Sequence, residues 1–218
     1  MATVLAAAPS AQTEERFVLR GVDWNVYEGI RQALGDHPTR LTFDGRNLEL
    51  MSPSPLHESY SYLFGRVLDT LTLELRIQIR GGRSMTFRRP ELKRGLEPDN
   101  CYWIQNEPAV RGKPDIDLAT DPPPDLAVEI DITHSSLDRL AIYAGLGVPE
   151  VWRFDGDSLY IYLRQPNGEY AESEHSNCLP SVPVRKLSPF LQLDEQLGDT
   201  TRMLAFADWV RAGFRTPK

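Results

Sequence analysis

Hydrophobic residues recur at helical spacing in several segments of the chain. The strongest pattern follows the Ser-Pro-Ser-Pro sequence at 52–55, and a second follows Asp23, a residue that can cap a helix N-terminus. The apolar positions are Tyr60, Leu63, Phe64, Val67, Leu68, Leu71 and Leu75 in the first segment, and Trp24, Tyr27, Ile30 and Leu34 in the second. Spacings of three and four residues place these side chains on one helical face, so both segments are predicted to be amphipathic helices.

Alternation of apolar and polar positions predicts the strands. The clearest case is Leu-Ala-Val-Glu-Ile-Asp-Ile at 126–132, where the even-numbered residues are all large and apolar while Glu129 and Asp131 share the other face. Short runs within 40–51, joined by a Gly-containing turn, predict a β-hairpin, and 150–163 predicts a second hairpin around an Asp-Gly turn.

The order of these elements defines the expected architecture. Further helices are predicted from Ser136 to about Leu146 and over about 201–213. Helices and strands are interspersed, and the sequence shows no internal repeat or low-complexity linker. We therefore predict an α/β protein with a loose N-terminal tail over residues 1–15 and a single domain over 16–218 that includes the C-terminal helix.

Composition narrows the class of protein. Hydrophobic residues make up 41% and charged residues 25%, as in an ordinary globular protein. No stretch approaches the roughly 18 apolar residues of a membrane span, and the N-terminal sequence lacks the basic residues of a signal peptide. Two cysteines, Cys101 and Cys178, indicate a reducing compartment. We expect a cytoplasmic protein that does not enter a membrane.

The charge balance limits the chemistry available. With 24 Lys+Arg against 31 Asp+Glu, the net charge of −7 argues against a general polyanion-binding surface. The only lysines are Lys93, Lys113, Lys186 and Lys218, so arginine supplies nearly all of the positive charge. Few lysines are therefore available for a catalytic role.

Acidic residues are the best candidates for a functional site. Glu129 and Asp131 lie side by side on one face of an otherwise apolar strand, where burial of two unpaired charges would cost several kcal/mol per ion. A divalent cation would compensate them, and oxygen ligands favour Mg²⁺, Mn²⁺ or Ca²⁺ over zinc. The alternative is an edge strand whose polar face is solvated.

Two further acids have equally ordinary explanations. Asp99, in Glu-Pro-Asp, precedes an apolar run and is also typical of a turn at the start of a strand. Glu58 falls in the first turn of the predicted helix, where negative charge is favourable in any helix. The order of these acids along the chain is more informative than any one of them: a helical Glu, then an Asp, then Glu-Xaa-Asp.

Four sequence segments carry a family resemblance. They are MSPSPLHE at 51–58, RRPELKRGLEPDNCYWI at 88–104, PDLAVEIDIT at 124–133 and YAGLGVPEVWRFD at 143–155. Over roughly residues 16–190 the chain resembles the Uma-two family of bacterial restriction-endonuclease-like proteins, placed in the PD-(D/E)XK nuclease superfamily. The resemblance implies a restriction-endonuclease-like core, in which helices flank a mixed central β-sheet. It also implies metal-dependent cleavage of DNA phosphodiester bonds.

The resemblance assigns roles position by position. Asp99 matches the motif aspartate, Glu129 the acid of the Glu-Xaa-Lys element, and Glu58 the glutamate of the preceding helix. In this interpretation Glu58, Asp99, Glu129 and Asp131 surround Mg²⁺ or Mn²⁺, which polarises a phosphoryl oxygen and lowers the pKa of its bound water.

The chain departs from the family pattern at the motif lysine. Asp131 stands where the superfamily has lysine, and Arg139 stands at the helical position from which many Uma-type sequences supply a lysine instead. Arginine can stabilise a phosphate, but its high pKa makes it a poor proton acceptor. Asp131 is then a candidate additional metal ligand. Arg139 completes the expected catalytic set of Glu58, Asp99, Glu129 and Asp131.

Two functional hypotheses remain open from the sequence. The first is a Mg²⁺- or Mn²⁺-dependent DNA endonuclease acting as a homodimer, as the family resemblance and the aromatic residues within 150–163 indicate. The second is a catalytically silent scaffold with the same fold, which works through self-association or protein binding. Carboxylates that converge within metal-ligand range in an open cleft favour the nuclease, whereas carboxylates that are splayed or capped by salt bridges favour the scaffold.

Overall fold

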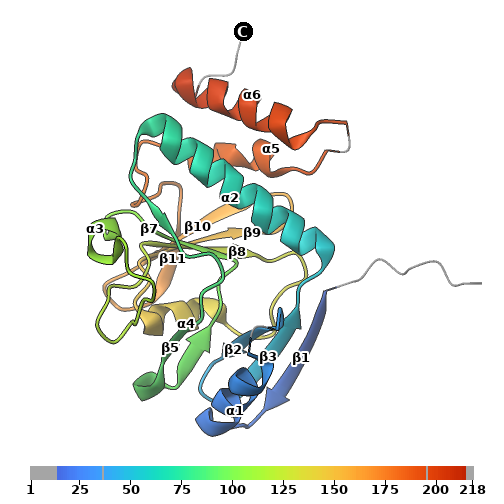
Figure 1. The fold of residues 1–218 in the computed structure, drawn as a ribbon, viewed down its shortest axis with the longest axis vertical. Coiled ribbons are helices and arrows are strands. Elements are labelled where there is room, and N and C mark those ends of the chain that lie inside the picture. The colour runs from blue at the N-terminus through green and yellow to red at the C-terminus, as the bar shows by residue number, and fades with distance from the viewer. Residues whose placement is uncertain (1–13, 36, 195, 215–218) are drawn as a thin grey trace, which may run out of the picture.

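Two β-sheets with helices packed on them form the part of the protein that the computed structural model describes, residues 14–35, 37–194 and 196–214 (Figure 1). Most of the expected N-terminal tail lies outside the described residues. Strand β1 (Glu15–Arg20), which was not predicted, begins at the last residue of that tail.

The smaller sheet is antiparallel. It has five strands in the order β1-β3-β2-β6-β5. After β1 these are β2 (Arg40–Phe43), β3 (Asn47–Ser52), β5 (Phe87–Arg89) and β6 (Arg94–Leu96). The predicted hairpin within 40–51 is the β2–β3 pair. Helix α1 (Trp24–Leu34) covers this sheet with Tyr27, and Asp23 caps it through a hydrogen bond from the Val26 amide, as predicted.

The larger sheet is mixed, and it is the sheet that the fold prediction anticipated. Its six strands run in the order β11-β10-β9-β8-β7-β4. Their bounds are β4 (Arg80–Gly81), β7 (Asn100–Trp103), β8 (Leu126–Ile130), β9 (Glu150–Phe154), β10 (Leu159–Arg164) and β11 (Tyr170–Ser173). Strands β8 and β9 are parallel, while the other pairs are antiparallel. The predicted α/β class with a mixed, helix-flanked sheet is confirmed.

Helices cover both faces of the mixed sheet. On one face lie α2 (Pro55–Leu75), α5 (Ser188–Leu191) and α6 (Asp199–Arg211), and on the other lies α4 (Arg139–Leu146); the short helix α3 (Glu107–Val110) follows β7 (Figure 1). Two 3-10 turns, at Pro90–Leu92 and Val184–Leu187, complete the elements described. No helix among the described residues is long and apolar enough to cross a membrane.

Alternation along the central strands separates two cores. Val128 and Ile130 of β8 pack beneath α2, whereas Ala127 packs against α4. Trp152 and Phe154 of β9 are fully buried in the α2 core, so they do not contribute to the exposed aromatic surface expected of the segment 150–163. Their burial follows from the period of the strand, which directs them to the covered face.

Two boundaries differ from the sequence prediction, and both bear on the site. Strand β8 ends at Ile130 rather than residue 132, because the chain turns after Asp131, whose carboxylate accepts a hydrogen bond from the Ser135 amide at 3.3 Å. Helix α4 begins at Arg139 rather than Ser136, with Asp138 as its N-cap. Asp131 therefore follows the strand, and Arg139 is the first residue of the helix.

Candidate active site

The candidate site lies where the two sheets meet. Residues 97–99 connect β6 of the antiparallel sheet to β7 of the mixed sheet, and Asp99 immediately precedes β7. Asn100 pairs with Val128, so Asp99 lies beside the segment that carries Glu129. The Asp99 amide donates to the Val128 carbonyl at 3.2 Å, and the Ile130 amide donates to Asp99 Oδ2 at 2.6 Å. Strand pairing thus fixes Asp99 between the two sheets.

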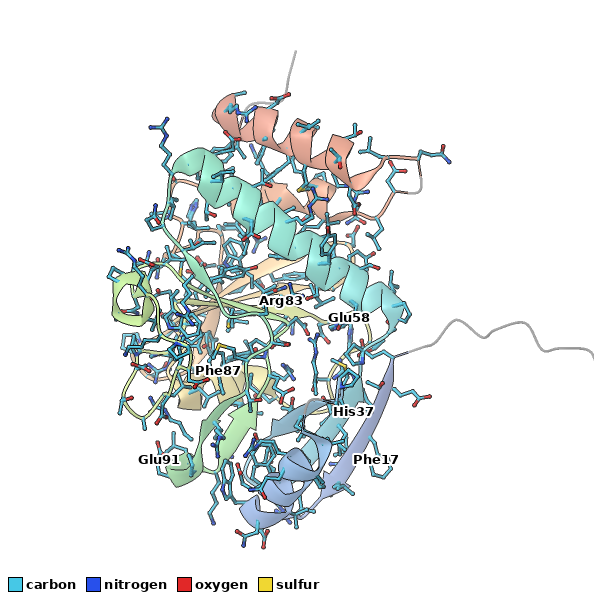
Figure 2. The ribbon with its side chains drawn as sticks, viewed as in Figure 1. Phe17, His37, Glu58, Arg83, Phe87 and Glu91 are labelled. Carbon is cyan, nitrogen blue, oxygen red and sulfur yellow. The ribbon has the colours of Figure 1, made fainter. Side chains whose placement is uncertain are left out.

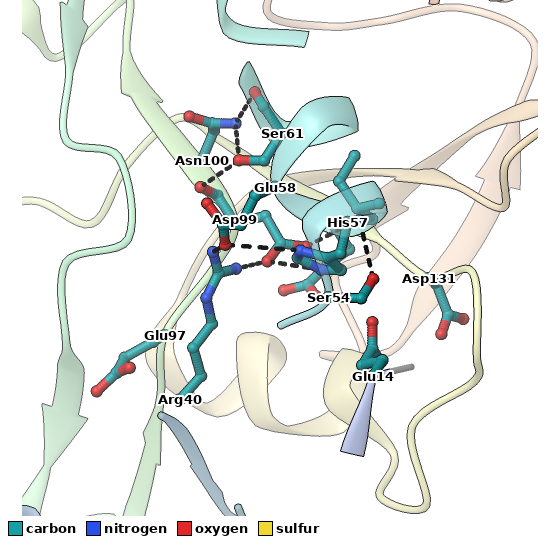
Figure 3. A network of polar contacts seen from close by, with 12 residues as sticks. Glu14, Arg40, Ser54, His57, Glu58, Ser61, Glu97, Asp99, Asn100 and Asp131 are labelled. Carbon is teal, nitrogen blue, oxygen red and sulfur yellow. Dashed lines mark hydrogen bonds and ion pairs between the residues drawn. The ribbon is translucent and has the colours of Figure 1, made fainter. Parts of the chain in front are cut away.

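Arg40, the first residue of β2, binds two of the predicted acids. Its Nη2 donates to Glu58 Oε1 at 2.7 Å, and its Nη1 forms an ion pair with Asp99 Oδ1 (Figure 3). Arg40 is 8% exposed and Asp99 is 3% exposed, so this ion pair is nearly dry. Burial lowers the pKa of Arg40 more than the surrounding carboxylates raise it. The apolar run that predicted β2 gave no sign that Arg40 would reach this centre.

Arg139 binds the third acid. Its Nη2 lies 2.7 Å from Glu129 Oε1 and 2.8 Å from the Glu97 carbonyl, and its Nη1 donates to Thr42 Oγ1. Burial disfavours charge on Arg139, but Glu129 outweighs it and raises the pKa of the guanidinium. Arg139 is thereby held against strands of both sheets.

Tyr143, one helical turn after Arg139, donates its hydroxyl to the same Glu129 oxygen. Because positions four residues apart share a helical face, α4 presents both donors to Glu129. Burial, followed by the negative charge of Glu129, raises the pKa of the Tyr143 hydroxyl well above 10. Tyr143 is the first residue of one segment that carries the family resemblance, but the sequence did not indicate this contact.

Glu58 and His57 come from the first turn of α2. Glu58 lies at the end of that helix nearest the antiparallel sheet, and its side chain is 52% exposed (Figure 2). The neighbouring His57 ring and the Arg40 guanidinium hold the pKa of Glu58 below its ordinary value. His57 is completely buried, and neither ring nitrogen has a hydrogen-bond partner among the described residues. Its Nε2 is 3.3 Å from Asp99 Oδ1, and its Nδ1 is 3.9 Å from Glu58 Oε1.

Asp131 lies apart from this network (Figure 3). Its carboxylate is 3.8 Å from His134 and 4.0 Å from Arg153. Asp131 and Glu129 both line a cavity of about 150 Å³ beside α4. The structure therefore brings Glu58, Asp99, Glu129 and Arg139 to the junction of the two sheets, where Arg40 contacts Glu58 and Asp99. The turn after β8 places Asp131 outside this network.

The expected metal ligands do not form a ligand set in this arrangement. Glu58 and Asp99 are paired with Arg40, and Glu129 is paired with Arg139. Among the residues described, no group of three or more His, Cys, Asp or Glu side chains is arranged to hold a metal ion. The oxygen donors suit Mg²⁺ or Mn²⁺ chemically, but their charge is already compensated by arginine. The carboxylates are therefore capped by salt bridges, which is the arrangement expected under the scaffold hypothesis.

Comparison with known proteins identifies a family. Residues 32–197 match the profile of the Uma2 family, which is described as "Putative restriction endonuclease". A solved structure, described as "a putative nuclease belonging to DUF820 from Anabaena variabilis ATCC 29413", is similar with 14% sequence identity and a TM-score of 0.48. The match covers 85% of this chain and 99% of that one. No curated protein matches the chain.

Proposed function

The chain belongs to the Uma2 family, and on this premise we propose that it is a DNA endonuclease that hydrolyses phosphodiester bonds at the junction of its two sheets. The proposed site consists of Glu58, Asp99, Glu129 and Arg139. Asp131, which lines the adjoining cavity together with Glu129, is a further member of the proposed site.

The observation that carries this proposal is that three acids from separate elements lie beside two arginines where the two sheets meet, and two of these acids are buried. Glu58 comes from α2, Asp99 from the residue before β7 and Glu129 from β8. Arg40 joins Glu58 to Asp99, and Arg139 binds Glu129. Buried ion pairs often stabilise a fold no better than apolar residues of the same size. Clusters of titratable groups with shifted pKa values beside a cavity are typical of active sites. Function explains this costly arrangement better than stability does.

Each side chain has a role suited to its chemistry. Arg139 presents a planar fork of N–H donors, which matches the geometry of a phosphate and remains charged at any physiological pH. Glu129, which also accepts the Tyr143 hydroxyl, holds Arg139 in a fixed direction at the start of α4. Mg²⁺ or Mn²⁺ is the cofactor we propose. Because the carboxylates are paired with arginines, no catalytic step is assigned to the metal.

A second candidate function is favoured by one specific observation. The carboxylates are neutralised by arginine, which is the arrangement expected of a catalytically silent scaffold that acts through self-association or protein binding. In that case the network would only join the two sheets, and DNA would not be a substrate.

A plasmid-nicking assay separates the two functions. Purified protein is incubated with supercoiled DNA in Mg²⁺, in Mn²⁺ and in EDTA, together with Asp99→Asn and Glu129→Gln. The control is Glu172→Gln, which removes a carboxylate from an exposed pair with Arg185 far from the site in sequence. Metal-dependent nicking that both site variants lose and the control retains would support the nuclease. Nicking that is absent, or equal in all four proteins, would reject it.

A further inference from the structure

A row of side chains crosses the mixed sheet away from the proposed site. In the register of the sheet, Glu129 of β8 is paired with Arg153 of β9, and Arg153 is paired with Tyr160 of β10. These strands are neighbours in the sheet (Figure 1). Residues paired across neighbouring strands direct their side chains to the same face, and each strand spacing is about 4.8 Å. Tyr160 therefore lies two strand spacings from Glu129, roughly 10 Å.

Two tyrosines hold the Arg153 side chain. Its guanidinium carbon lies 5.0 Å from the centre of the Tyr162 ring and 5.8 Å from the centre of the Tyr160 ring. Arg153 Nη2 also donates to the Tyr162 hydroxyl at 2.6 Å. A guanidinium over aromatic rings gains cation–π energy, and this contact keeps its planar fork of donors in one direction. Arg153 is thus oriented without being buried, because its side chain is 38% exposed.

The positive charge of Arg153 is held more loosely than that of the neighbouring arginine. Arg153 Nη1 is 4.0 Å from Asp131 Oδ2, whereas Arg139 Nη2 is 2.7 Å from Glu129 Oε1. All four of these residues line the cavity of about 150 Å³ beside α4. A partly exposed cation in this position can bind an anionic ligand that also reaches the cavity.

We propose that Arg153 and Tyr160 form a platform for an unpaired DNA strand, in which Arg153 binds a backbone phosphate and one base stacks on the Tyr160 ring. This inference rests on the proposed function, because the platform continues from the same site. It names the substrate class: a base offers its face to a tyrosine only where the strand is single or the duplex is locally opened.

The chemistry of the row supports this choice of ligand. A basic residue that contacts the backbone, combined with an aromatic ring that stacks with a base, is how proteins bind single strands without reading their sequence. Stacking acts at contact distance, so it does not require the general basic surface that a chain with a net charge of −7 lacks. The row also leads into the cavity of the proposed site, which favours a DNA strand over a second copy of the chain as its occupant.

The test measures DNA binding without cleavage. Fluorescence anisotropy of a short fluorescein-labelled oligothymidine is recorded in EDTA over a series of KCl concentrations, and a fully paired duplex of the same strand length is the comparison ligand. The proteins are the wild type, Arg153→Gln, Tyr160→Leu and Tyr160→Phe. Thermal melting verifies that each variant is folded, and light scattering gives its mass.

A second arginine–tyrosine pair supplies the matched controls, Arg66→Gln and Tyr62→Leu. The Arg66 guanidinium lies 5.8 Å from the centre of the Tyr62 ring, so the contact is of the same kind as that between Arg153 and Tyr160. This pair belongs to α2, which covers the opposite face of the mixed sheet from α4.

We expect Tyr160→Leu to bind oligothymidine roughly fivefold more weakly than the wild type, or worse, because it loses the stacked base. Its salt dependence should be unchanged, because no charge is removed. Arg153→Gln should also bind more weakly, and its slope of log affinity against log salt should fall by about 0.7, the value for one phosphate contact on a single strand. Tyr160→Phe keeps the ring and should match the wild type, as should both controls. The wild type should bind the duplex more weakly than oligothymidine.

The outcomes distinguish this inference from the proposed function. Equal oligothymidine binding by Tyr160→Leu and wild type, or tighter binding of the duplex, would overturn the inference even if the wild type nicks plasmid DNA. A loss of affinity in Tyr160→Leu that accompanies a change in particle mass would assign the ring to a contact between copies and overturn it as well. If Tyr160→Leu does not fold, an unchanged salt slope in Arg153→Gln would overturn it instead. The expected binding pattern without any nicking would support the platform and count against hydrolysis.

Discussion

Arg139 meets two different demands at the scale of a single residue. The family resemblance places a lysine at this position, whereas the structure uses the guanidinium as a clamp on three acceptors: Thr42 Oγ1, the Glu97 carbonyl and Glu129 Oε1. A lysine keeps the charge and has three N–H donors, but all of them are on one nitrogen, whereas Arg139 reaches the three acceptors from two separate nitrogens. Catalysis and stability should therefore respond differently to substitution here.

We expect Arg139→Lys to retain or increase nicking activity, while its free energy of unfolding falls by about 1–3 kcal/mol because buried acceptors lose their donor. Arg139→Ala should lower nicking without weakening Mn²⁺ binding. Urea denaturation, plasmid nicking and calorimetry measure the three quantities. The control is Arg185→Lys, in a partly exposed pair, which should change stability by no more than about 0.5 kcal/mol. Equal nicking by Arg139→Ala and wild type would remove Arg139 from the site.

Sequence reasoning selected the acids of the network but missed the cation that joins them. Asp99, Glu129 and Glu58 occur in short motifs whose order along the chain is distinctive. Arg40 is one of many arginines and precedes an ordinary apolar run. Its contact with Asp99 joins residues that are distant in the sequence, and only the packing of the two sheets brings them together. No local pattern could have indicated it.

The N-terminus of α4 matters most at the scale of elements. The helix begins at Arg139, and Asp138 is its N-cap. The conformation of Asp138 therefore fixes the position of the Arg139 backbone. The Asp138 carboxylate accepts a hydrogen bond from the Ala141 amide at 3.1 Å and satisfies one of the free N–H groups of the first turn. The position of Arg139 thus depends on an exposed residue that does not touch the network.

Asp138→Ala is expected to lower the free energy of unfolding by about 1 kcal/mol, because the capping hydrogen bond is lost. Asp138→Asn, which can still cap, should remain within about 0.5 kcal/mol of the wild type. Urea denaturation measures both values. An alanine variant as stable as the asparagine variant would show that the cap does not hold the start of α4.

Elements with a regular period were predictable, and those defined by tertiary pairing were not. The stripes of α1 and α2 and the alternation of β8 gave these elements with nearly correct ends. The alternation also continued through Asp131, but the turn at Asp131 and Ser135 ends the strand first. Strands as short as β4 are too brief to show a period. They exist only because a longer neighbour pairs with them.

At the scale of the whole molecule, the junction of the two sheets creates the site. The mixed sheet was expected, and the antiparallel sheet beside it was not. That sheet depends on the pairing of β2 with β6, seen at Phe43 and Gly95, which are far apart in the sequence. This pairing places β2, and with it Arg40, against the segment that carries Asp99. The contact between Arg40 and Asp99 therefore depends on the tertiary fold and not on any local sequence pattern.

The whole molecule is expected to self-associate if DNA is its substrate. A chain with a net charge of −7 has little long-range attraction to DNA, whose binding usually depends on phosphates neutralised by basic residues. A homodimer that presents two sites to one duplex would compensate for this. Fewer aromatic side chains are available for a dimer interface than the sequence predicted, because Trp152 and Phe154 are buried. Tyr160 and Tyr162 remain partly exposed beneath Arg153, whose guanidinium lies 5.8 and 5.0 Å from their rings.

Light scattering at micromolar protein should give roughly twice the 24.7 kDa mass of the chain if it forms a two-fold dimer. If the tyrosine surface forms the interface, Tyr160→Glu should shift the mass toward 24.7 kDa, because a charge on that surface opposes its burial. Leu73→Glu is the matched control, because Leu73 is 75% exposed on α2, on the other face of the mixed sheet. A wild type of 24.7 kDa would reject the dimer. A dimer disrupted by Leu73→Glu instead of Tyr160→Glu would move the interface to α2.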